Sequence, residues 1–239
     1  MLQGFEFSRE GVPIELPVTA QRLIAFLAIA ARPVNRLYVA GVLWPDSPEG
    51  RASGSLRSAL WRLQRSAPGC VVALGSRLAL APQVAVDLHE VMQRAHALLS
   101  QAADEEDQGS DPFSFAYELL PDWYDEWLAD ERERVRQLLL HALEALSVRL
   151  RARADYAQAV EAAQLAVAGE PTRESARRAL IEAHLAEGNV DQAIREFQHF
   201  RELLARELGI QPSGRLTGLL EGARRAVRPP VLHDQPTLH

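Results

Sequence analysis

The second half of this chain repeats itself at a spacing of about 34 residues, and this periodicity limits its fold more than any other feature. A period of this length is typical of helix–turn–helix units that stack on one another. One such pair of helices cannot bury its apolar face alone, so we expect neighbouring helices to pack on both sides of the repeats. The matching positions are Leu146 and Leu180, Tyr156 and Val190, Ala159 and Ala193, Val160 and Ile194, Ala163 and Phe197, and Ala166 and Phe200.

Turn residues stand at the same places in both copies. The first copy begins Ala154-Asp155-Tyr156 and reaches Pro171, and the second begins Gly188-Asn189-Val190. A small-residue turn, an alanine three residues after the first apolar residue and a closing proline are typical of tetratricopeptide repeats. Helices at about 125–153 and 213–225 are expected to flank and cap the stack. Residues 101–110 are predicted to be an acidic loop, and 227–239 a disordered tail.

Residues 1–82 show a different pattern, in which short strands surround three helices. The predicted elements are strands at 2–8 and 12–16, helices at 20–31, 35–43 and 51–67, and a hairpin at 70–74 and 77–81. Thr19 and Asn35 are the expected N-caps of the first two helices. This order predicts a winged helix-turn-helix. The expected fold class is therefore mainly α: a winged helix with short β-hairpins, followed by an all-α repeat domain.

The charge of the chain is divided between these two regions. All 26 cationic residues are arginine, and the net charge is −6. Residues 1–81 carry nine arginines and five acids, a charge of +4, whereas 82–239 carry 17 arginines and 27 acids, a charge of −10. A basic first third joined to an acidic remainder is typical of a DNA-binding domain attached to a domain with another partner.

Several classes of protein are disfavoured by what the sequence lacks. Cys70 is the single cysteine, which leaves no internal disulfide and no cysteine-based zinc site. The apolar runs are too short for a membrane span, and no secretion signal is recognised, so we expect a cytoplasmic, nucleoid-associated protein without membrane contact. The seven histidines form no metal-binding pair, and no phosphate-binding glycine motif occurs. We therefore expect no enzyme activity, catalytic residue, cofactor or metal.

The helix predicted at 51–67 carries the candidate DNA-binding residues. Leu56, Leu60 and Leu63 form an apolar stripe that should face the domain core. Ser55, Ser58, Arg62 and Arg65 then lie on the opposite side, with Arg57 and Trp61 beside them, and Arg77 stands at the tip of the predicted wing. Arginines so placed can reach guanine edges or phosphates. The alternative is an ordinary amphipathic helix with solvated arginines.

A second constellation is Asp122-Trp123-Tyr124-Asp125-Glu126-Trp127, in which carboxylates alternate with aromatic residues. Two tryptophans four residues apart would share one face of a helix and could anchor the repeat domain on its neighbour. Paired carboxylates of this kind also occur in hydrolases, with Asp122 as the residue to test. The aromatic anchor is the favoured interpretation.

Taken together, these motifs resemble the Streptomyces antibiotic regulatory protein family from Gln3 to about Ala223. In that family a winged helix like that of response regulators precedes a bacterial transcriptional activation domain. The stretches that carry the resemblance are 32–46, 55–63, Val86-Asp87-Leu88, 120–132, 170–176 and 185–189. The implied domains are a winged helix at 1–82, an activation domain at 86–226 and a tail at 227–239.

The resemblance implies DNA contacts at Ser55, Arg57, Ser58 and Arg62. Together with the helix and wing positions, the predicted DNA-binding residues are Arg51, Ser55, Arg57, Ser58, Arg62, Arg65 and Arg77. Arg62 matches a base-reading arginine. The loop 44–50, with Trp44, Asp46 and Glu49, matches a segment that contacts RNA polymerase or its sigma factor. No stretch of the sequence resembles the nucleotide-binding module of larger relatives, so no ATP-dependent switch is expected. Two residues depart from the pattern, because related helices carry a small residue in place of Trp61 and a cation in place of Gln64.

The leading hypothesis is a sequence-specific transcriptional activator that binds promoter repeats, usually as a side-by-side pair, and recruits RNA polymerase. The regulated genes are expected to belong to a secondary-metabolite cluster. The alternative is a protein-interaction adaptor whose winged helix no longer reads DNA. The modest charge of residues 1–81 and the departures at Trp61 and Gln64 motivate this alternative.

Overall fold

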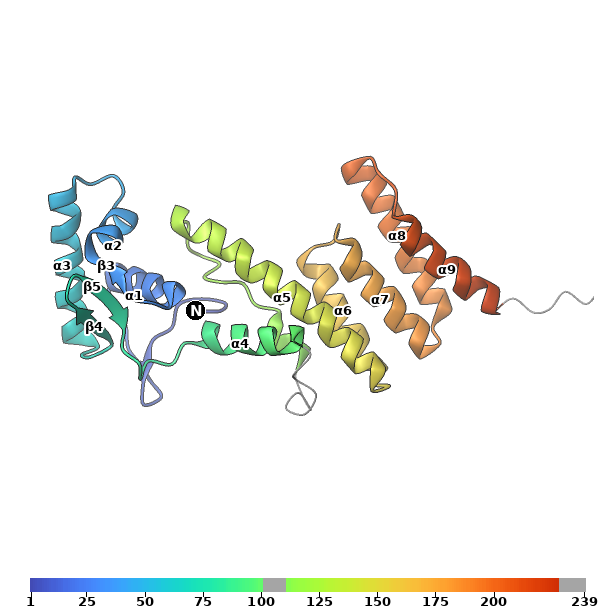
Figure 1. Cartoon of the computed structure of the whole chain (residues 1–239), viewed down its shortest axis with the longest axis horizontal. Helices are drawn as coiled ribbons and strands as arrows, with labels where there is room; N and C mark the ends of the chain where they lie inside the picture. The colour runs from blue at the N-terminus through green and yellow to red at the C-terminus, as the bar shows by residue number, and fades with distance from the viewer. Residues whose placement is uncertain (101–110, 228–239) are drawn as a thin grey trace, which may run out of the picture. The chain divides into compact units, whose positions relative to one another are not determined.

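The computed structural model describes residues 1–100 and 111–227, which form two compact units (Figure 1). The first unit contains residues 1–100 and 117–139, and the second contains 111–116 and 140–227. The expected fold class is confirmed, since the chain is mainly helical with small β-hairpins near its N-terminus. The predicted loop at 101–110 and the predicted tail beyond 227 lie outside the described residues. None of the described helices is both long and apolar enough to cross a membrane.

The first unit contains a three-stranded sheet and the helices around it. The sheet has the order β3-β5-β4, and all its pairs are antiparallel. The elements of this unit in chain order are β1 (Ser8–Arg9), β2 (Val12–Pro13), α1 (Val18–Ala30), β3 (Val34–Asn35), α2 (Arg36–Leu43), α3 (Glu49–Ser66), β4 (Val71–Leu74), β5 (Arg77–Leu80), α4 (Asp87–Leu99) and the first part of α5 (Glu126–Ala152). Strand β3 was not predicted, because two residues give no detectable alternation.

The core of this unit lies where α1, α3 and β5 meet. Leu23 and Leu27 of α1, Leu56 and Leu63 of α3, and Leu78 of β5 are all buried there. Replacing a buried leucine of this kind by alanine typically costs about 2–5 kcal/mol of unfolding free energy. The core therefore fixes which face of α3 is turned to solvent.

The ends of the helices confirm one predicted cap and overturn the other. The Asn35 side chain accepts a hydrogen bond from the Leu37 amide at 2.9 Å, as expected for the N-cap of α2. Thr19 is not the cap of α1, because the helix already begins at Val18, after Pro17. The extended backbone of Pro17 is followed directly by helical turns, and the Thr19 hydroxyl is left buried without a partner among the described residues.

The predicted N-terminal strands are much shorter in the structure. β1 and β2 have two residues each, paired Ser8 with Pro13 and Arg9 with Val12. The earlier residues of the predicted strand 2–8 pair elsewhere, since Leu2 forms an isolated bridge with Leu119. Such a long-range pairing leaves no mark in the local sequence.

The two tryptophans at 123 and 127 do not share a helical face, which corrects the prediction. α5 begins at Glu126, so Trp123 precedes the helix and stacks on Phe5, with ring centroids 5.8 Å apart. Trp127 meets Phe26 of α1 edge-on at 5.3 Å. Both contacts lie within the first unit. The aromatic residues thus join the start of α5 to the winged helix.

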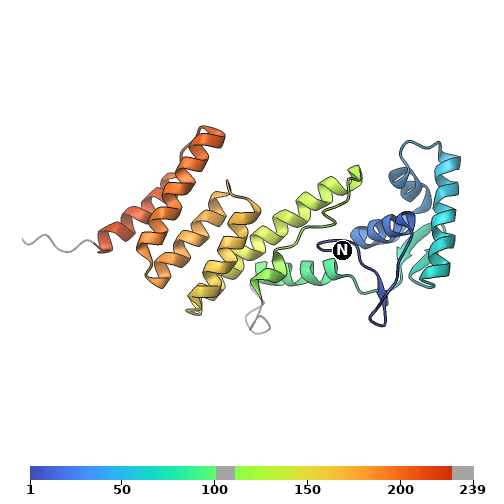
Figure 2. The same cartoon turned by 180° about the vertical axis from the view of Figure 1, so that it is seen from behind.

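The second unit is a series of packed helical hairpins. It contains the short 3-10 helix η1 (Pro112–Phe115), the second part of α5, and then α6 (Tyr156–Gly169), α7 (Glu174–Glu187), α8 (Val190–Leu208) and α9 (Gly214–Val227). Helices α6 and α7, and then α7 and α8, lie side by side in both views (Figure 1, Figure 2). The assignment of these hairpins to the tetratricopeptide class stays a prediction.

The sequence repeat corresponds to equivalent buried positions in this unit. Ala159 and Ala193 are fully buried, and Leu146 and Leu180 are nearly so. Gly188 ends α7 in the left-handed conformation, with φ of 92°, which a residue with a side chain rarely adopts. The small-residue turn therefore lets the chain reverse between α7 and α8.

Candidate nucleic-acid interface

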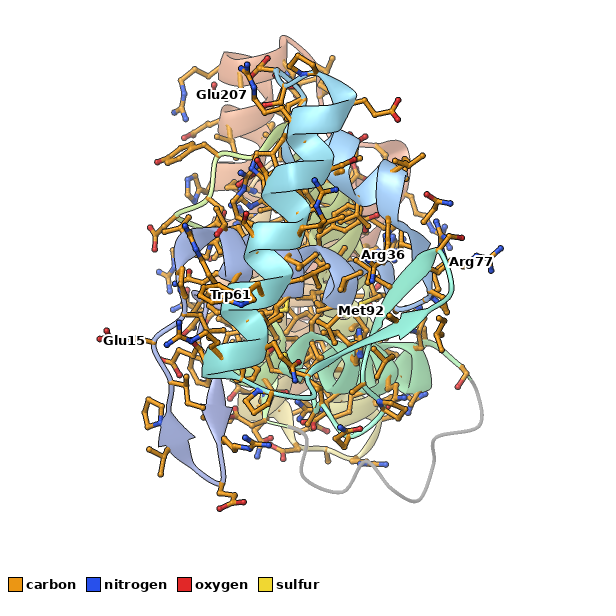
Figure 3. The ribbon with its side chains drawn as sticks, turned by 90° about the vertical axis from the view of Figure 1, so that its left-hand side faces the viewer. Glu15, Arg36, Trp61, Arg77, Met92 and Glu207 are labelled. Atoms are coloured by element: carbon orange, nitrogen blue, oxygen red, sulfur yellow. The ribbon has the colours of Figure 1, made fainter. Side chains whose placement is uncertain are left out.

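Helix α3 presents one face to the core and the opposite face to solvent. Its inward residues are Ala52, Leu56, Ala59 and Leu63, all nearly inaccessible, and Leu60 is half-buried beside them. Figure 3 looks onto α3 from its solvent side, and the labelled Trp61 lies on the face turned to the viewer. The apolar stripe predicted from the sequence therefore does face the core.

The candidate residues on α3 lie on its outward face with one exception. Arg51, Arg57, Ser58, Arg62 and Arg65 are exposed, whereas Ser55 is half-buried. Trp61 is 61% exposed, and the Arg65 guanidinium lies 4.9 Å from the centre of its ring. The helix therefore carries four exposed guanidinium groups between its first turn and its last.

Arg77 stands at the tip of the wing formed by β4 and β5. It is exposed and is paired in register with Leu74 across the turn at Gly75, whose φ of 61° is in the left-handed region. The carbonyl of Ser76 in the same turn accepts a hydrogen bond from the Arg36 amide at 2.9 Å. The wing tip is thereby tied to the first turn of α2, and Arg77 points away from it (Figure 3).

A shallow groove of about 390 Å³ runs between α3 and the wing. Arg36, Arg57, Trp61 and Gln64 contribute polar or aromatic atoms to it, and its apolar lining includes Leu63 and Leu78. Among the described residues, no carboxylate lines this groove. Its cationic lining and the lack of acids suit a polyanionic backbone.

Arg36 is a residue of this interface that the sequence did not reveal. Its Nε atom is buried and has no hydrogen-bond partner in the described part of the chain, and the residue lines the groove together with Arg57. Arg36 could have been identified only from the pairing of β3 with β5, which brings its neighbour Asn35 opposite Arg77. That pairing joins segments far apart in the chain and is not visible in the local pattern.

The arginines of residues 1–81 differ from those later in the chain in their partners. Of the nine in residues 1–81, only Arg22 has a carboxylate partner among the described residues; its Nε donates to Asp125 at 2.8 Å. In the second half of the chain, ion pairs are formed by Arg134, Arg136, Arg151, Arg173, Arg177, Arg195 and Arg206. The cations of α3 and the wing are thus free to meet an external anion.

The predicted polymerase-contact residues lie between α2 and α3. Trp44 is the C-cap of α2, and its half-buried side chain packs against the core. Asp46 is exposed in the loop. Glu49 is exposed but is the first residue of α3, so the loop is shorter than predicted. Asp46 and Glu49 are therefore accessible acids at this corner.

The titratable groups with shifted pKa values lie off the exposed face of α3, although the buried Cys70 lines the groove from below. Burial raises the pKa of the Cys70 thiol. Burial also opposes ionisation of Asp87, but hydrogen bonds from the Met1 ammonium and the Leu2 amide hold its pKa below its usual value. Hydrogen bonding from Arg136 lowers the pKa of the exposed Glu133 to about 2. Each shift has a structural partner and indicates no acid–base chemistry on α3.

Hydrolytic and metal chemistry gain no support from the remaining carboxylates. Asp122 is exposed, and Asp125 is held by Arg22 and by the Trp127 indole N–H at 3.1 Å. Within 1–100 and 111–227, histidine, cysteine and acidic residues form no cluster able to hold a metal ion. The face formed by α3 and the wing, with its exposed arginines that form no ion pair among the described residues, is therefore the candidate functional site.

Known proteins resemble this chain in sequence over its second half and in fold over most of its length. Residues 85–222 match the family described as bacterial transcriptional activator domain. No curated protein matches the chain in sequence. The solved structure of Mycobacterium tuberculosis EmbR in complex with a low affinity phosphopeptide has a similar fold, with a TM-score of 0.73 and 19% identity. The likeness covers 93% of this chain, which spans 63% of the EmbR chain.

Proposed function

The chain belongs to the bacterial transcriptional activator domain family, and on that premise we propose that it binds promoter DNA through α3 and the wing. In this proposal α3 enters the major groove, and the wing meets the adjacent backbone or minor groove. The second unit, within which most of the family match falls, recruits the transcription machinery. The regulated promoters control a secondary-metabolite gene cluster.

The observation that carries the proposal is the set of arginines without carboxylate partners on one face. Arg51, Arg57, Arg62 and Arg65 project from α3, and Arg77 projects from the wing. Among the described residues none of them forms an ion pair. Neutralising phosphates with such groups releases counterions, which supplies most of the affinity of DNA-binding proteins and makes it depend on salt. The face thus supports DNA as the partner despite the net charge of −6.

Individual roles are proposed from the family resemblance together with position on the helix. Base reading is assigned to Arg62, which lies in the C-terminal half of the exposed face. Ser55 and Ser58 are small enough to allow close approach of the helix to the groove. Arg51, Arg57, Arg65 and Arg77 contact phosphates or neighbouring bases. We expect Arg62→Ala to weaken specific binding by about 1–3 kcal/mol.

Contact with RNA polymerase or its sigma factor is assigned to the corner between α2 and α3. Asp46 and Glu49 are exposed there, and Trp44 supports the loop by packing on the core. The adjacent exposed acids suit a basic partner surface. Two copies bind side by side on repeated half-sites.

A mobility-shift titration on promoter fragments from the gene's own neighbourhood tests the proposal. The test variant is Arg57→Ala/Arg62→Ala, and the matched control is Arg134→Ala/Arg195→Ala. The control arginines are also exposed but are already paired with Glu131 and Asp191. The test pair should lose at least tenfold in affinity while the control retains it. Equal affinity of the two doubles would refute the proposal, and failure of the wild type to shift any fragment would favour the adaptor function.

A further inference from the structure

Trp61 occupies the middle of the outward face of α3. At 3.6 residues per turn it lies about 140° around the helix from the buried Leu56, and Arg65 lies about 180° around from the same leucine. The sequence pattern had placed Trp61 at the edge of this face. In the structure the indole is 61% exposed and borders the groove beside the wing, and Figure 3 shows it on the side of α3 turned to the viewer.

A single exposed aromatic residue needs no explanation by itself. Trp61 differs because its ring is held in place. The Arg65 guanidinium lies over it at 4.9 Å, one helical turn further along α3. A cation in this position attracts the face of the ring and fixes its orientation. The pair thus presents a rigid apolar surface in the middle of a cationic face.

The major groove of B-DNA offers very few apolar partners to such a surface. The edges of the base pairs display hydrogen-bond donors and acceptors, and the one apolar group among them is the C5-methyl of thymine. The indole can be desolvated favourably only against that methyl or against the sugars of the backbone. The sugars lie at the groove walls, whereas Trp61 lies at the middle of the outward face.

We infer that Trp61 determines specificity by packing against a thymine methyl group in the major groove, with Arg65 as the positioning residue that holds the indole. This inference rests on the proposed DNA-binding function. The stacked guanidinium keeps its N–H edge free to donate to a neighbouring phosphate or guanine. One A·T pair in each half-site should therefore be required by Trp61.

Replacing thymine by deoxyuridine tests this directly, because the two bases differ only in the methyl group. The probe is the duplex selected by the wild-type protein from a randomised library, with each thymine replaced in turn. Burial of one methyl group predicts a loss of about fourfold at one position in each half-site. Trp61→Ala should bind the selected duplex more weakly and should show no further loss at that position.

Two controls separate the outcomes. Tyr124→Ala removes an aromatic residue that is 94% exposed and lies outside α3, and it should keep the deoxyuridine response. Trp61→Phe retains an aromatic surface and should keep part of it. If no duplex is selected, the proposed function itself fails. If the wild type selects a duplex but Trp61→Ala responds to every deoxyuridine as the wild type does, the function stands and this inference is overturned.

Discussion

Replacing Arg77 with alanine should flatten the salt dependence of promoter binding. Arg77 is exposed at the wing tip and has no carboxylate partner among the described residues. Its replacement should leave the fold intact, because its side chain forms no hydrogen bond with the described residues and its backbone pairing with Leu74 does not need the side chain. The variant therefore removes a phosphate contact and little else.

The size of the effect follows from the number of exposed arginines on α3 and the wing tip. If Arg62 reads a base, then Arg51, Arg57, Arg65 and Arg77 remain for phosphates on each subunit. Four contacts predict a slope of log K against log salt of about −3.6, and three predict about −2.7. Raising the salt from about 50 to 200 mM should then weaken the wild type about 150-fold and the variant about 40-fold for each bound subunit.

Fluorescence anisotropy with a labelled promoter duplex at four salt concentrations measures these slopes. Arg195→Ala is the matched control, because Arg195 is also exposed but is paired with Asp191 on α8. Its slope should equal that of the wild type. An unchanged slope in Arg77→Ala, or an equal change in Arg195→Ala, would show that free arginines on the wing do not contact phosphates.

Three further predictions concern the packing of the first unit. Trp127→Ala should lower the free energy of unfolding, measured by urea denaturation, by about 2 kcal/mol, because the indole packs edge-on against Phe26. Replacing the exposed Tyr124 by alanine should change it by less than about 0.5 kcal/mol, and similar losses in the two variants would argue against this packing. Cys70, buried and with a raised pKa, should react slowly with a thiol reagent at mildly alkaline pH until denaturant unfolds the chain, and rapid labelling of the folded protein would contradict its burial. Gly54→Ala should raise the free energy of unfolding by up to about 1 kcal/mol, since alanine favours the helix and its Cβ would lie 3.6 Å from Arg57 Nη2 without a clash. The same change should weaken DNA binding if α3 approaches the groove closely. A melting temperature below that of the wild type would refute the expected stabilisation.

The sequence predicted the helices well where their periodicity was strong. The three helices of the winged helix and the wing itself were located to within two residues, because apolar spacing and the breakers Pro33 and Pro68 are local signals. The family resemblance drawn from the same motifs is confirmed by the match over 85–222, and EmbR has a similar fold. The boundary expected between 82 and 86 stays a prediction.

What failed in the sequence analysis depended on contacts between distant segments. Strand β3 is formed by the pairing of Val34 and Asn35 with β5, and Trp123, which precedes α5, stacks on the distant Phe5. Local propensity carries no information about such partners.

By itself the sequence determined which face of α3 is buried, because the leucine spacing admits one solution, and it placed the arginines of α3 and the wing within the first unit. Only the tertiary structure decided that those arginines have no carboxylate partner among the described residues, whereas Arg22 of α1 meets Asp125 from a distant segment. It also placed Arg36 in the groove and set Arg65 over Trp61. The residue types on the outward face of α3 determine its chemistry, and the packing of distant segments determines its geometry.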